Sequence, residues 1–119
     1  MKLKTSELSG NLNLAYWLLN KTLFEGRLPD CKVKVANLSP EGLDGAFIYD
    51  ETTNTPKYLI ISSKASDHIK TLVHEMTHVY HRIILGYKDK VDHPPSFVRL
   101  LRSRYKKLGL TLDPEDLEN

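Results

Sequence analysis

The chain is poor in cysteine and has no long apolar segment, and each absence excludes a class of protein. Its single cysteine, Cys31, rules out an internal disulfide and a zinc ribbon built from cysteines. No apolar run approaches the roughly 18 residues that a membrane span requires. Residues 1–7 carry two lysines but lack the apolar core of a signal peptide. We therefore expect a cytoplasmic protein with no membrane partner.

The residues that are present suit one small folded unit. Of the 119 residues, 40% are hydrophobic and 27% are charged, a balance typical of a globular domain. We assign residues 1–112 to this domain. Residues 113–119 carry four acidic residues and no basic one, which predicts a disordered acidic tail. A monomer is the default expectation for the oligomeric state.

Positive charge gathers in one segment although the net charge is only +2. Residues 96–107 hold five basic residues and no acidic one: Arg99, Arg102, Arg104, Lys106 and Lys107. Such a cluster suits a phosphate backbone. From charge alone, a helix face exposed to solvent is an equally good explanation.

The first half of the chain predicts one helix and a short sheet. Apolar residues at spacings of three and four run from Leu12 to Leu23 and predict a helix that Gly26 and Pro29 end. Trp17 falls on or beside the apolar face, so we expect it in the core. Short turn-forming connections predict a small antiparallel or mixed sheet. Its strands are expected at residues 31–36, 46–49 and 58–62.

The second half of the chain predicts two helices. One begins near Asp67, which suits an N-cap, and ends at Gly86. The other begins after Pro94 and Pro95 and turns basic residues outward. The predicted fold is α+β in the order α-β-β-β-α-α, with the short sheet packed against the second helix.

The second helix carries the motif His-Glu-x-x-His, formed by His74, Glu75 and His78. Residues four apart lie on one helix face, so the two imidazoles can share one divalent metal at about 2.0–2.1 Å. Glu75 can take a proton from a metal-bound water without binding the metal itself. A surface position for all three is disfavoured, because the same helix carries a long apolar stripe.

A catalytic zinc site also needs a third protein ligand and an open position. The metzincin pattern fails, because His81 and Ile84 stand where that pattern requires glycine and histidine. Glu115 and Glu118 are the only glutamates further along, and both fall in the acidic tail.

Three other residues remain as candidates for the third ligand. His81 could approach the metal only if the helix were distorted. Asp89 and Asp92 could offer carboxylates from the following loop. His93 is the best candidate, because residues 86–93 can span about 26 Å when extended and so return to the metal.

At these residues the sequence resembles the SprT-like domain, the metalloprotease domain of Spartan-type proteins. Asn20 and the segment Phe24-Glu25-Gly26-Arg27-Leu28-Pro29 are similar to that family's N…F-x-G-x-L-P pattern. Residues 71–78 resemble its active-site helix, including the methionine after the glutamate. Residues 93–97 resemble its H-G-x-x-F segment, with Pro94 in place of the glycine. The resemblance covers about residues 12–108.

The resemblance implies a zincin-like fold and one zinc ion per chain, held by His74, His78 and His93. It implies Glu75 as the catalytic base. It also implies DNA-dependent cleavage of proteins bound or crosslinked to DNA, and hence a place in repair near the nucleoid. The basic residues from Arg99 to Lys107 then become candidates for DNA binding.

In this mechanism an extended protein substrate pairs with a free sheet edge, offered by the strand at 46–49 or the strand at 58–62. Tyr49, Tyr87 and His81 are candidate donors to the oxyanion. Two other functions remain open. One is a zincin-fold DNA-binding module without catalysis. The other is a metal-dependent hydrolase of a different class, such as a three-histidine endoribonuclease, although such sites commonly lack the glutamate.

Overall fold

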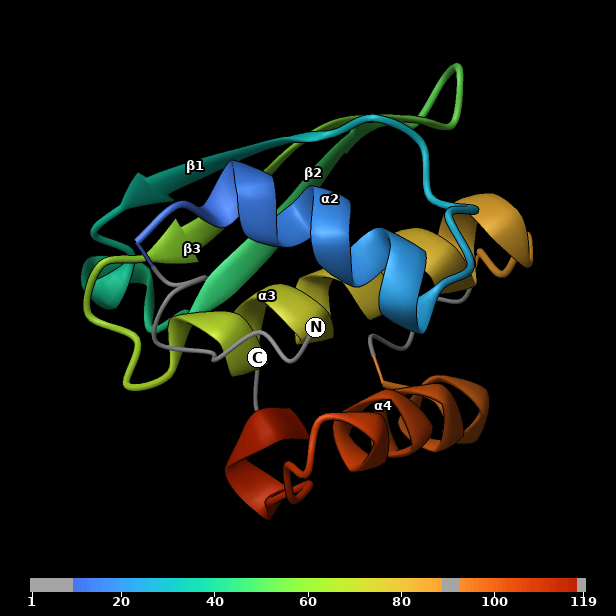
Figure 1. The fold of residues 1–119 in the computed structure, drawn as a ribbon. Helices are drawn as coiled ribbons and strands as arrows, with labels where there is room; N and C mark the ends of the chain where they lie inside the picture. The colour runs from blue at the N-terminus through green and yellow to red at the C-terminus, as the bar shows by residue number, and fades with distance from the viewer. Residues whose placement is uncertain (1–9, 89–92, 118–119) are drawn as a thin grey trace.

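The computed structural model describes residues 10–88 and 93–117, and its elements follow the predicted α-β-β-β-α-α order (Figure 1). The helices are α2 (Leu12–Leu23), α3 (His68–Val79) and α4 (Pro95–Lys107). The strands are β1 (Lys32–Ala36), β2 (Gly45–Asp50) and β3 (Thr55–Ser62). A π-helical turn continues α3 over Tyr80–Ile84, and short 3-10 turns lie at Ser39–Glu41 and Pro114–Leu117. Among the described helices, none combines the length and the apolar character needed to cross a membrane.

The three strands form one mixed sheet in the order β1-β3-β2. β1 runs parallel to β3, and β2 runs antiparallel to it. β3 is therefore the central strand and has no free edge for a substrate. Of the two predicted docking strands, only β2 lies at an edge, so the expectation for residues 58–62 is wrong. Sequence pattern could not decide this, because strand order depends on which segments meet in space.

Helix α3 is the central element of the core. Asp67 caps its N-terminus by accepting a hydrogen bond from the Lys70 amide at 3.0 Å. The helix packs against the sheet and α2 on one side and against α4 on the other (Figure 1). At most 1% of each of its core side chains is exposed: Ile69, Leu72, Val73, Met76 and Val79. Because the helix is covered on several sides, its polar motif also lies in a buried setting.

Trp17 is not in the core, contrary to the expectation from helical spacing. Its side chain is 53% exposed, and the Lys21 ammonium lies 3.7 Å from the centre of its ring. The neighbouring Tyr16 points inward instead and donates a hydrogen bond to the Pro29 carbonyl. Helical periodicity does not specify how wide the buried apolar face is. A residue at the margin of that face, such as Trp17, can therefore be either buried or exposed.

The acidic segment is folded over residues 113–117, where the sequence predicts a disordered tail. Lys70 on α3 lies 3.0 Å from Asp113 and 2.9 Å from Asp116. The amide of Asp113 also donates to the Asp116 carboxylate at 2.7 Å. The counter-charge for this segment thus comes from a helix more than forty positions earlier, which a local count of charges does not reveal.

Two asparagines of α2 pair with backbone outside the helix. Asn13 accepts from the Val33 amide at 2.9 Å and donates to the Val33 carbonyl at 3.1 Å. Asn20 makes the same pair of bonds to Leu28, both at 3.0 Å. Each carboxamide therefore satisfies both polar groups of one backbone residue, as a neighbouring strand would.

We expect Asn20→Ala to lower the free energy of unfolding by about 1–3 kcal/mol, because it leaves two backbone groups of the buried Leu28 unpaired. Thr22→Ala is the matched control. The Thr22 hydroxyl bonds only within its own helix, to the Leu18 and Leu19 carbonyls, so its loss should stay within about 0.5 kcal/mol. Urea unfolding measures both. Equal losses for the two variants would contradict the role assigned to Asn20.

Candidate metal centre

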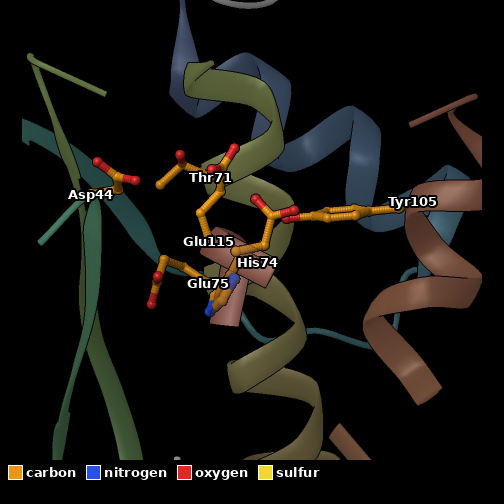
Figure 2. Close-up of a pocket in the computed structure, with 7 residues that line it drawn as sticks. Asp44, Thr71, His74, Glu75, Tyr105 and Glu115 are labelled. Atoms are coloured by element: carbon orange, nitrogen blue, oxygen red, sulfur yellow. The ribbon is translucent and has the colours of Figure 1, made fainter. Parts of the chain in front are cut away.

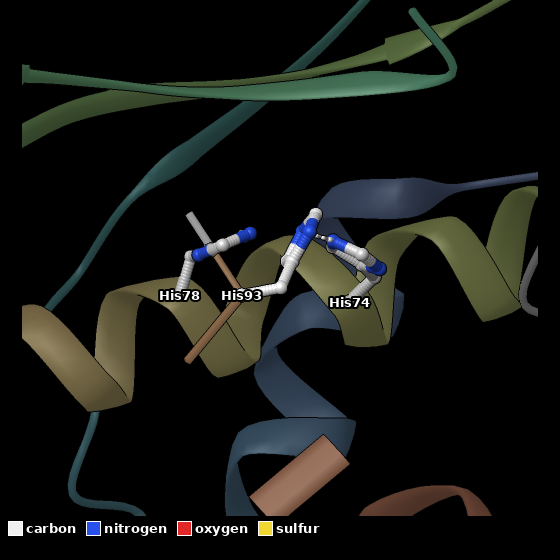
Figure 3. A group of neighbouring side chains, drawn as sticks. All are labelled: His74, His78 and His93. Atoms are coloured by element: carbon white, nitrogen blue, oxygen red, sulfur yellow. Dashed lines mark hydrogen bonds between the residues drawn. The ribbon is translucent and has the colours of Figure 1, made fainter. Parts of the chain in front are cut away.

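Three histidines converge from two parts of the chain. His74 and His78 lie one turn apart on α3, with ring centres 5.0 Å apart. His93 comes from the segment that leads into α4, and its Nε2 lies 3.1 Å from Nε2 of His74. Figure 3 shows the His93 ring reaching in between the other two. Each residue offers a ring nitrogen, and these nitrogens all lie within 4.8 Å of one another. The three predicted ligands are therefore close enough to hold one metal ion.

One pair of ring nitrogens has about the spacing of two ligands on a tetrahedral ion. Bonds of about 2.0–2.1 Å at tetrahedral angles place ligand nitrogens about 3.3 Å apart. The 3.1 Å between His74 and His93 is close to that value. Imidazole suits zinc, copper, iron and nickel alike, so the three histidines are close enough to hold a metal ion but do not select which one.

The surroundings favour the neutral form of His74 and His78. Burial, with added repulsion from His93, lowers the pKa of His74 to about 4. Burial also lowers the pKa of His78 well below its ordinary value, with added repulsion from His74 and His93. Neutral imidazole is the form that binds a metal ion, so both side chains are ready as ligands near neutral pH.

Phe97 packs among the histidines from the first turn of α4. It is fully buried, and its ring stacks on His78 with centres 4.1 Å apart and planes 20° apart. Its centre lies 5.4 Å from that of His74 and 5.2 Å from that of His93. Helical spacing does not connect Phe97 with His74 and His78, because only the tertiary fold brings α4 to this face of α3.

Glu75 turns toward the sheet rather than toward α4. It is only 4% exposed and packs against β2 at Gly45. Together with His74 it lines a cavity of about 20 Å³, enough for about one water molecule (Figure 2). The motif thus presents a carboxylate and an imidazole to one small buried space.

The same cavity is lined by Glu115, weighed above as a distant glutamate, and by four residues that sequence reasoning did not single out: Asp44, Thr71, Tyr105 and Asp116. Several of them also line a larger neighbouring cavity of about 350 Å³. Thr71 stands one turn before Glu75 on the helix, so helical spacing could have found it. The others come from distant segments and left no local signal.

Lys70 joins the acidic segment to α3, and Tyr105 joins α4 to the same lysine. The Tyr105 hydroxyl donates to the Lys70 carbonyl at 3.2 Å. Burial lowers the pKa of Lys70, but hydrogen bonds from its ammonium to Asp116 and Asp113 raise it more, so the net pKa lies above the ordinary value. The lysine therefore stays charged and holds the acidic segment beside the cavity.

Four of the five basic candidates on α4 are exposed: Arg99, Arg102, Lys106 and Lys107. Arg104 differs from them and is partly buried. Its guanidinium centre lies 5.2 Å from the ring centre of Phe24 and 5.6 Å from that of Tyr80. Five basic positions spread over nine residues of a helix cannot all face one side, and Arg104 falls on the flank that faces Phe24 and Tyr80.

The remaining candidates do not join the group of three histidines. His81 is buried and lies 2.8 Å from the Ser96 hydroxyl through its Nε2. Tyr87 stacks on His81, and Tyr49 lies beneath the Arg82 guanidinium. Glu115 lines the cavity beside Glu75. The other tail glutamate, at position 118, and the loop candidates Asp89 and Asp92 lie outside the described residues.

No protein-family model, curated protein or solved structure matches this chain, so the site is interpreted from its own geometry.

We expect Gly45→Ala to disturb Glu75 and to lower the free energy of unfolding by about 1–3 kcal/mol. A methyl group there would lie 2.9 Å from Thr71 Cγ2 and 3.0 Å from Glu75 Cγ. Thr71→Ser removes the closest of these atoms. The double variant should therefore recover part of the loss, measured by urea unfolding against Thr71→Ser alone. Strictly additive losses would contradict this account of the contact.

We also expect the metal-free protein to lose stability as the pH falls from about 6.5 toward 4. The pKa of His74 is about 4 in the folded state against an ordinary value of 6.5, so the unfolded chain binds the proton first. The contribution is complete above pH 6.5 and declines below it. Urea unfolding in the presence of a chelator measures the slope, and His74→Gln should make it shallower. An unchanged slope in this variant would be inconsistent with a neutral buried His74.

Proposed function

We propose that this chain is a zinc-dependent metalloendopeptidase of the SprT-like type, with one zinc ion per chain. The observation that carries the proposal is the convergence of His93 on His74 and His78. If the His-Glu-x-x-His motif had arisen by chance, no third imidazole would be expected beside it. Here Nε2 of His93 lies 3.1 Å from Nε2 of His74. The sequence resemblance adds a reaction, because the same three histidines and Glu75 match that family's site.

In this proposal His74, His78 and His93 hold the ion, and Glu75 is the base. Bound zinc would supply a Lewis acid that lowers the pKa of a water molecule and polarises a peptide carbonyl. The Glu75 carboxylate takes the proton of the attacking water and later delivers it to the departing amide nitrogen. Its contact with Gly45 keeps the carboxylate next to His74 during both transfers.

The sheet supports the binding of an extended peptide. β2 pairs with β3 along one edge and belongs to no other pairing among the described strands. Glu75 packs on Gly45 at the start of this strand. A peptide added along the other edge of β2 would hydrogen-bond through its backbone and lie beside the catalytic carboxylate.

We further propose that the protein substrates are bound or crosslinked to DNA. The sequence resemblance supports this, together with the exposed basic residues Arg99, Arg102, Lys106 and Lys107 of α4. α4 also supplies Phe97 to the histidine cluster, so a DNA contact on its outer face would place the bound protein near the site.

We expect Glu75→Gln to retain zinc and to lose cleavage by a factor of about 100 or more. The amide keeps the size of the side chain but cannot accept the proton. Metal content and proteolysis of a DNA-binding protein, with and without DNA, measure both effects. Glu51→Gln, the same change in an exposed turn, is the matched control.

The outcomes separate the competing functions. A wild-type protein that holds no metal when purified without chelator would overturn the metalloprotease and favour a DNA-binding module. An active Glu75→Gln variant would overturn the base. Cleavage of RNA, with protein substrates left intact, would instead favour a three-histidine endoribonuclease.

Charge reversal should test the DNA surface. We expect Arg99→Glu, Arg102→Glu and Lys106→Glu together to weaken DNA binding at least about tenfold and to reduce its salt dependence. Lys32→Glu, Lys57→Glu and Lys64→Glu form the matched control, since they change the net charge equally at exposed positions elsewhere. Fluorescence anisotropy at several salt concentrations measures both. If the two triple variants weakened DNA binding equally, net charge alone would explain the binding and α4 would have no specific role.

A further inference from the structure

The π-helical turn at the end of α3 carries a buried histidine that the metal site does not use. The Leu85 amide bonds to the Tyr80 carbonyl at 3.0 Å, five residues back, which widens the turn relative to an α-helix. His81 lies within this turn and is only 6% exposed. Wide turns of this kind recur at functional sites.

His81 contacts the chain on both sides of His93. Its Nε2 lies 2.8 Å from Oγ of Ser96, three residues after His93. Its ring stacks on that of Tyr87 with centres 4.5 Å apart and planes 10° apart, and the Tyr87 amide donates to the His81 carbonyl at 3.1 Å. Tyr87 precedes His93 in the sequence. One buried side chain therefore anchors both ends of the connection that delivers the third histidine.

The third histidine needs such an anchor more than the other two. His74 and His78 are set by the backbone of α3, whereas His93 stands outside any helix. Pro94 and Pro95 follow it and have no amide hydrogen, so neither can tie the backbone down by donating a bond. No side chain caps the start of α4. The Ser96 hydroxyl instead bonds to His81. This bond fixes the orientation of the first turn of α4, which the packing of Phe97 alone does not.

We propose that His81 is a positioning residue that keeps His93 within reach of the metal through its hydrogen bond to Ser96. This inference rests on the proposed metal centre and adds a residue to it. Partners outside the ligand shell typically change metal affinity by about 10–100-fold, because they hold a ligand in its binding geometry. His81 acts one step further away, through the backbone between Ser96 and His93, so an effect near tenfold is expected.

Ser96→Ala is the most direct test, because it removes one hydroxyl from a helix without adding bulk. We expect zinc affinity, measured by competition with a chromophoric chelator, to fall about tenfold, and the absorption bands of the Co²⁺-loaded protein to shift. Ser103→Ala is the matched control on the same helix, since the Ser103 hydroxyl donates to the Leu100 carbonyl of its own turn and accepts from the adjacent Arg104 guanidinium. Ser96→Thr keeps a hydroxyl and should restore the affinity.

His81→Phe provides an independent variant, because it keeps an aromatic ring against Tyr87 and loses the bond to Ser96. It should weaken zinc binding as Ser96→Ala does, and the two changes combined should cost no more than either alone. Wild-type affinity in both variants would overturn the positioning role, even if the metal-free protein became less stable. A wild-type chain that binds neither zinc nor Co²⁺ would overturn the metal centre itself, so the two failures are distinguishable.

Discussion

The constraint on which this structure depends is the burial of helix α3 together with its polar motif. The helix supplies the centre of the core, and the same turns carry His74, Glu75 and His78. Burying a polar group without a hydrogen-bond partner typically destabilises a fold by about 1–3 kcal/mol. Each buried polar group of the motif therefore needs a partner in its surroundings. Thr77 shows the simplest solution, since its hydroxyl donates to the Val73 carbonyl of its own helix at 2.7 Å.

The other polar side chains of the motif have neighbours both from α4 and from the sheet. Toward α4, the imidazoles stay neutral and pack against Phe97 and His93. Toward the sheet, Glu75 lies against Gly45, where any larger side chain would collide with it. His74 and Glu75 nevertheless line one cavity, so the candidate metal ligands and the candidate base remain neighbours.

The end of α3 shows how a local change in helix geometry extends this arrangement. The wide turn at Tyr80–Ile84 directs His81 to the start of α4, and Arg82 to Asn54 in the turn between β2 and β3. At the other end of the helix, Lys70 holds Asp113 and Asp116. The α3 helix and its π-helical turn are thus tied at both ends to segments that are distant in sequence.

By itself, the sequence determined the type and order of the elements, the buried stripe of α3, and the three histidines with Glu75. These are local properties, because helical spacing and turn residues act over a few positions. The tertiary structure alone decided that β3 is central, that Trp17 is exposed, that Arg104 turns inward and that residues 113–117 fold onto Lys70. Each of these depends on a partner far along the chain, such as the counter-charge of Lys70 or the rings of Phe24 and Tyr80. Local periodicity and composition carry no information on such partners, because only packing brings them together.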